Sequence, residues 1–320
     1  STLFPYTTLF RSELGDEDEK LSYILEADSD ETLFKYIEEF EFNKSYRHSV
    51  MFKLEDFSQD KIHKSIEDGK LSLYKREPDM KDSVNESEII PTLKMVNENI
   101  YIKFSYLIKP QIVNSDLKVI KYIILCDLDL ENNILELRFD RAPKGYHSTK
   151  DFYVQMVNET LARLCSLLDL KIGTIDFKAI IEYIRHIEDD EIYIYAMEMH
   201  RNGSKAYLDS MSNDDMTIPI LGELKEFINA NEELFDFNDK TLEIKRKVND
   251  FIENIEVTSD LPSIKVIWPE SDIRVGIKHD YKGEDYSLFM YYDELIDSKE
   301  KMDYVRNYFI KHYRDLNAED

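Results

Sequence analysis

The sequence contains few of the residues that build loops and common cofactor sites. Glycine and proline occur only eight times each in 320 residues, below their usual share in globular proteins. Because glycine is so scarce, the sequence has no glycine-rich phosphate-binding loop. No serine stands in the tight turn that carries the nucleophile of α/β-hydrolases. The sequence therefore carries no motif of a nucleotide-dependent enzyme or a serine hydrolase.

Cysteine and long apolar runs are also scarce. The two cysteines, Cys126 and Cys165, lack metal-ligand spacing, and the seven histidines include no pair at the helical spacing of a metal site. We expect both thiols to be free and buried in a reducing compartment, which predicts a cytoplasmic protein without a cofactor or a metal. No apolar run approaches the roughly 20 residues that a membrane-spanning helix needs.

Acidic residues outnumber basic ones. The chain has 66 aspartates and glutamates against 41 lysines and arginines, a net charge of −25. Such a field repels nucleic acids and anionic membranes, so we expect no membrane partner. A local basic patch still acts within a Debye length of roughly 8–10 Å. The abundance of lysine, isoleucine, asparagine and tyrosine is typical of AT-rich genomes and predicts a bacterial or phage source.

The beginning of the chain resembles the translation of a short-read sequencing adapter. We therefore treat residues 1–12 as a non-native segment and expect the natural sequence to continue from near Glu13. The remaining length allows one large domain or two ordinary ones. We place a boundary near His147, giving an N-terminal α+β domain over 13–147 and a C-terminal α+β domain over 148–320.

Two stretches have the alternation of antiparallel strands. From Ile100 to Lys109 apolar and polar residues alternate, 118–126 is apolar on both faces, and Leu135, Leu137 and Phe139 return after an asparagine-containing turn. A second meander is predicted over 264–268, 273–279 and 286–292, and helices over 151–168, 176–187, 221–228, 240–255 and 293–313, with a frayed tail from Leu316. The predicted fold class is α+β, with two mainly antiparallel sheets packed with helices.

The end of the first meander carries a cluster of cations. These anion-binding candidates are Arg138, Arg141, Lys144, His147 and Lys150. They lead into a predicted helix N-terminus, where backbone N–H groups favour an anion. The alternative is a solvated loop whose cations pair with the abundant carboxylates of the chain.

Acidic residues lie at the turn of the same hairpin. Asp127, Asp129 and Glu136 are the catalytic candidates, because carboxylates at the ends of adjacent strands can hold a divalent metal. With Arg138, the pattern resembles the Asp…Glu-x-Lys arrangement of restriction-type nucleases, with arginine in place of lysine. An acidic hairpin turn is also expected by chance in a chain with 66 acidic residues.

Three functions are compatible with these patterns. The first is a non-enzymatic protein-interaction module that uses its acidic surface and its aromatic C-terminal half, with a protein partner or a second copy. The second is a nucleic-acid or nucleotide sensor that binds through the basic loop 138–150 alone. The third is a metal-dependent phosphodiesterase. Because no catalytic motif is present, the first is preferred.

Overall fold

The computed structural model describes residues 32–74, 84–85, 88–97, 99–111, 119–146, 151–187, 191–201, 203–209, 221–258, 260–292 and 299–319. Its first elements are α2 (Thr32–Asn43), β1 (His48–Asp56), α3 (Gln59–Glu67), β2 (Ser72–Leu73), β3 (Val84–Asn85), β4 (Glu88–Ile89), β5 (Thr92–Val96), β6 (Asn99–Ile108), β7 (Ile120–Asp129) and β8 (Ile134–Phe139). They are followed by α5 (Phe152–Leu168), β9 (Lys171–Gly173), α6 (Phe177–His186), β10 (Tyr193–Arg201), β11 (Ser204–Asp209), α7 (Leu221–Ala230), α8 (Glu232–Phe235), α9 (Asp239–Thr258), β12 (Asp260–Trp268), β13 (Ile273–Lys278), η2 (Tyr281–Gly283), β14 (Leu288–Tyr291) and α10 (Glu300–Glu319).

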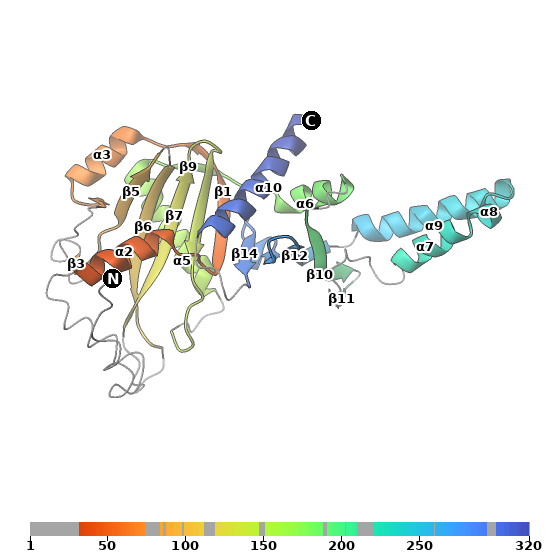
Figure 1. The fold of residues 1–320 in the computed structure, drawn as a ribbon, viewed down its shortest axis with the longest axis horizontal. Helices are drawn as coiled ribbons and strands as arrows, with labels where there is room; N and C mark the ends of the chain where they lie inside the picture. The colour runs from red at the N-terminus through yellow and green to blue at the C-terminus, as the bar shows by residue number, and fades with distance from the viewer. Residues whose placement is uncertain are drawn as a thin grey trace, which may run out of the picture.

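A single large sheet organises the molecule. Twelve described strands form it in the order β11-β10-β12-β13-β14-β1-β8-β7-β6-β5-β2, with β9 paired to β1 (Figure 1). All pairings are antiparallel except that of β2 with β5. The predicted α+β class is confirmed. The two predicted meanders, however, are parts of one sheet rather than two sheets.

Strand β1 is the element that joins the meanders. His48 lies opposite Phe139 of β8 on one side and opposite Met290 of β14 on the other. Val50 and Met51 are both buried, so β1 is covered on both faces, as a central strand requires. The predicted boundary residue His147 lies outside the described residues, and the β1–β14 pairing connects segments on its two sides.

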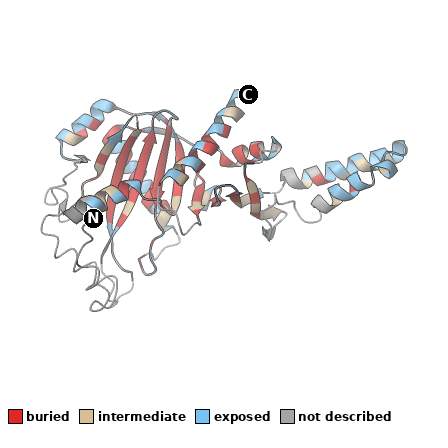
Figure 2. Ribbon diagram, in the orientation of Figure 1, coloured by how far each residue is buried: buried red, intermediate tan, exposed pale blue. Residues whose placement is uncertain are grey.

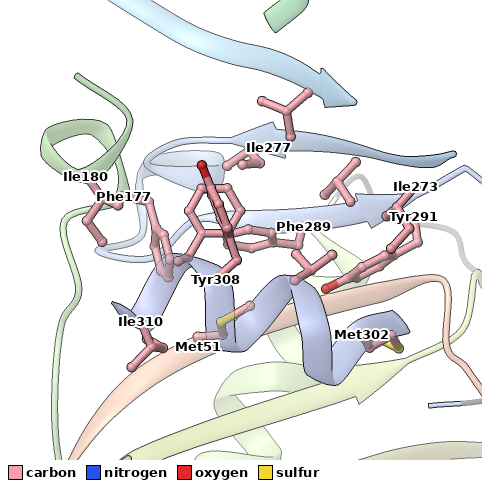
Figure 3. Close-up of a cluster of buried hydrophobic side chains, with 14 of the residues drawn as sticks. Met51, Phe177, Ile180, Ile273, Ile277, Phe289, Tyr291, Met302, Tyr308 and Ile310 are labelled. Atoms are coloured by element: carbon pink, nitrogen blue, oxygen red, sulfur yellow. The ribbon is translucent and has the colours of Figure 1, made fainter. Parts of the chain in front are cut away.

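Helices cover both faces of the sheet. On one face, α2, α6 and α10 pack against the strands, and Figure 3 shows Phe177 and Ile180 of α6 gathered with Phe289 around α10. On the opposite face, α5 packs against β1, β8, β7 and β6 through residues that include Val157 and Leu164. Among the described residues, no helix combines the length and apolar character needed to cross a membrane.

Several local features of the structure follow from residues that are close in sequence. Ser58 and Asp176 cap the N-termini of α3 and α6, accepting hydrogen bonds from the backbone N–H groups of Lys61 and Ala179. Gly69, just beyond α3, has a φ of +69°, the left-handed conformation that glycine adopts readily at helix ends. These features depend on residues close in sequence, which is why periodicity and capping patterns locate them.

Removing the cap of α6 is expected to cost about 1 kcal/mol of unfolding free energy. Asp176 Oδ1 accepts the Ala179 N–H at 3.1 Å, and alanine cannot replace this acceptor. Urea unfolding of Asp176→Ala measures the loss. Asp176→Asn serves as the control, because asparagine caps helices about as well as aspartate. Equal destabilisation by both substitutions would contradict a capping role.

Three predictions about side-chain environment and helix ends are wrong. Cys126 is buried as expected, but Cys165 is exposed on the outer side of α5. The tail expected to fray from Leu316 belongs to α10, which continues to Glu319, because Leu316 packs against the core. Helix α10 begins at Glu300 rather than at Asp293, and residues 293–298 lie outside the described part of the chain.

Candidate functional site

The three carboxylate candidates lie together in the interior. Asp127 and Glu136 are directly opposite each other across the β7–β8 pair, and both are 0% exposed. Like charges placed directly opposite in a sheet repel each other. Arg138, also fully buried, compensates this repulsion, because its Nη2 lies 2.6 Å from Glu136 Oε2. The fold therefore places these residues next to one another, but in the interior rather than at a solvent-exposed surface.

Helix α10 covers the cluster and contributes charged side chains to it. Arg306 places Nη1 2.6 Å from Asp127 Oδ2 and Nη2 3.2 Å from Asp129 Oδ2. Asp303, one turn earlier, accepts a hydrogen bond of 2.6 Å from Arg138 Nη2. We call this set the buried charge network; its members are Asp127, Asp129, Glu136, Arg138, Lys299, Asp303 and Arg306. It links β7, β8 and α10 by ion pairs.

The protonation states of the network follow from its pairing. Burial alone would lower the pKa of Arg138, but Glu136, Asp303 and Asp127 raise it far above its usual value. Burial alone would raise the pKa of Asp303, yet Arg138 and Arg306 lower it overall. Arg138 and Asp303 are therefore held in their charged forms by each other and by their neighbours in the network.

The carboxylates of this network are enclosed together with arginines. Arg306 lies next to Asp127 and Asp129. Among the residues that the structure describes, no group of three or more His, Cys, Asp or Glu could hold a metal ion. Helix α10 also covers these carboxylates, and its Arg306 is itself only 4% exposed. The ion pairs of the network connect β7 and β8 to α10 in the interior.

The described anion-binding candidates differ in their exposure. Arg138 points into the buried charge network and is 0% exposed, whereas Arg141 and Lys144 are exposed on the loop after β8. His147 and Lys150 lie outside the described residues. Only two described cations of the predicted cluster therefore face solvent.

The aromatic residues near the C-terminus are mostly core residues. Phe289, Tyr291 and Phe309 are at most 3% exposed and pack under α10. Trp268 contacts Phe309 with the two rings nearly perpendicular and their centroids 5.9 Å apart. Tyr304, at 40% exposed, is one of the few that reach the surface. The predicted aromatic interaction surface is therefore largely used for packing.

A different part of the molecule exposes several large apolar side chains close together. Helices α7, α8 and α9 form a hairpin, here called the helical arm, that extends away from the sheet (Figure 1). Figure 2 shows that most of the arm is exposed, in contrast to the sheet. Within the described residues of the arm, its own core contains only two fully buried side chains, Ile228 and Ile252. The arm thus has much less buried apolar surface than the rest of the fold.

One side of the arm is apolar and solvent-exposed. We call it the apolar flank; its residues are Phe227 (58% exposed), Leu234 (69%), Ile244 (53%) and Phe251 (59%). Three of these residues line a shallow hollow of about 180 Å³ between the helices. Monomeric soluble proteins rarely expose large apolar side chains that are clustered in this way. Sequence reasoning located the helices but missed the flank, although Ile244 and Phe251 are seven residues apart.

Comparisons with protein-family models, with curated proteins and with solved structures gave no match to this chain. The functional argument therefore depends on the site geometry alone.

Proposed function

We propose that this protein is a non-enzymatic interaction module that binds a protein partner through the apolar flank of the helical arm. The observation that supports this proposal most directly is the exposure of four large apolar side chains, three of which line an apolar hollow. Fully burying such a side chain from full exposure is worth about 1.5–3 kcal/mol. Because the four are 53–69% exposed, their burial offers about 4–7 kcal/mol in total toward the cost of forming an interface.

The two alternative functions have less support. A phosphodiesterase needs carboxylates that reach a substrate, whereas Asp127 and Glu136 are enclosed with Arg138 and Arg306. A nucleic-acid sensor needs several cations on one surface, and only Arg141 and Lys144 of the predicted loop are exposed among the described residues. Against a net charge of −25, two exposed cations give little attraction for a polyanion.

Site-specific photo-cross-linking tests the proposal. A photoreactive phenylalanine analogue at Phe227, introduced in the source cells, is expected to capture a protein in high yield. The same analogue at Leu242 is the matched control. Leu242 is 51% exposed, but it lies two residues from Ile244 and therefore on another side of α9. Capture that is absent, or equal at the two positions, would contradict the proposal.

A further inference from the structure

The apolar residues of α9 are arranged symmetrically along its axis. Ile244 stands seven residues before Phe251, and Phe237, in the turn directly before α9, stands seven residues before Ile244. Seven residues correspond to two helical turns, so Ile244 and Phe251 share one face. Phe237 is 81% exposed at the tip of the arm. The pattern reads the same in both directions from Ile244.

We call Phe237, Ile244 and Phe251 the apolar stripe. The charged residues beside it, which we call the charged stripe, alternate in sign along α9. Lys240, Glu243, Lys247 and Asp250 follow one another at spacings of three and four residues, so they line one edge of α9. The order of charges is positive, negative, positive, negative. When such a helix meets an identical antiparallel helix, each positive position faces a negative one. With the two-fold axis beside residue 245, Lys240 faces Asp250 of a second copy and Glu243 faces its Lys247.

We propose that the partner of the arm is a second copy of this chain, which binds through an antiparallel α9–α9 contact. This inference rests on the proposed function and specifies its partner. Ile244 of the two copies meets near the two-fold axis, and Phe251 of each copy lies against Phe237 of the other. The apolar stripe and the charged stripe give the same register within one helical turn.

The exposed area is adequate for such a dimer. At the exposures given above, Phe227, Leu234, Phe237, Ile244 and Phe251 offer about 600 Å² of apolar surface per copy. A standard interface buries about 800 Å² per partner, and the charged stripe supplies polar surface around the apolar centre. The arm therefore has enough surface for an interface of ordinary size.

The antiparallel direction also limits repulsion between two chains of net charge −25. From residue 245 to the base of the arm at Thr258 the helix rises about 20 Å, so the two bases lie about 40 Å apart. This separation is several Debye lengths at physiological salt. In a parallel contact, the sheets of the two acidic chains would instead lie at the same end of the α9–α9 pair.

Sedimentation velocity and light scattering on the full chain test the dimer. The wild type is expected at twice the 38.0 kDa chain mass at micromolar concentration. Ile244→Ser with Phe251→Ser is expected to be a monomer, whereas Leu242→Ser remains a dimer. All three positions are more than half exposed, so far-UV circular dichroism should show unchanged helix content.

A charge exchange tests the register. Lys240→Glu opposes two carboxylates at each end of the contact and is expected to raise the dimer dissociation constant about tenfold. Adding Asp250→Lys restores opposite charges across the contact and is expected to recover the wild-type constant. An additive loss in the double variant would overturn the antiparallel register.

The outcomes separate this inference from the proposed function. A wild-type monomer at high micromolar concentration, or a dimer insensitive to Ile244→Ser with Phe251→Ser, would overturn the inference. If cross-linking from Phe227 then captured a different protein, the proposed function would stand with another partner. If it captured nothing, both would fail.

Discussion

Replacing Arg306 by methionine is expected to lower the free energy of unfolding by about 3–5 kcal/mol, because it leaves buried carboxylates without their cation. Arg306 Nη1 lies 2.6 Å from Asp127 Oδ2 and 3.6 Å from Glu136 Oε2, and both acids are fully buried. After the substitution, Arg138 remains 3.7 Å from Asp127 Oδ2 and cannot satisfy every carboxylate. Urea unfolding, which does not screen charges, measures the change.

A matched control and a double-mutant cycle locate the effect. Arg314→Met alters an exposed arginine of the same helix, which donates to the Glu131 carbonyl, and is expected to cost less than about 1 kcal/mol. Adding Asp127→Asn to Arg306→Met removes one orphaned charge and is expected to recover part of the loss. A loss in Arg306→Met no larger than that in Arg314→Met would refute the structural role of the network.

The second large effect is a loss of stability in mild acid that depends on His279. Burial, assisted by Lys178, lowers the pKa of this histidine to about 4 from its ordinary 6.5, although Asp280, Asp176 and Asp260 act in the opposite direction. As the pH falls below about 6.5 the unfolded chain takes up a proton, whereas the folded protein resists protonation until about pH 4. The contribution of His279 to the free energy of unfolding is therefore fully present above pH 6.5. It is lost between pH 6.5 and 4, by about 3 kcal/mol.

The variant His279→Asn is expected to remove this part of the pH dependence. Asparagine keeps an acceptor for Ser287 Oγ, which lies 3.0 Å from His279 Nδ1, but it does not titrate. Urea midpoints measured from pH 7 to pH 4 should fall less steeply for the variant than for the wild type. His63→Asn, at an exposed position on α3, is the control and should keep the wild-type slope. Parallel slopes for all three proteins would show that His279 does not cause the effect.

Local patterns in the sequence predicted most elements of this fold. Ser58, Asp176 and Gly69 each act within a few residues of their own position, and the helix predicted over 176–187 corresponds to α6. The alternation from Ile100 to Ile108 likewise predicted β6, because side chains in a strand point alternately to its two faces. The α+β class follows from these local signals.

The sequence alone could not predict which polar residues become buried. Glu136 and Arg138 alternate with apolar residues on β8, and this pattern ordinarily indicates a solvated face. Arg306 and Asp303, more than 160 residues further along the chain, cover that face with compensating charges. A catalytic site and a structural network have the same residue types here, and only their distant partners distinguish them.

By itself, the sequence determined the elements, their caps and the acidic character of the chain, since each depends on neighbouring residues or on totals. Only the tertiary structure decided that β1 joins both meanders into one sheet, because strand pairing depends on contacts between segments far apart in sequence. The tertiary structure also decided which apolar residues on helices become buried and which stay exposed. Ile180 of α6 is buried against the sheet, whereas Ile244 of α9 stays exposed, because the arm extends beyond the sheet and leaves that side uncovered.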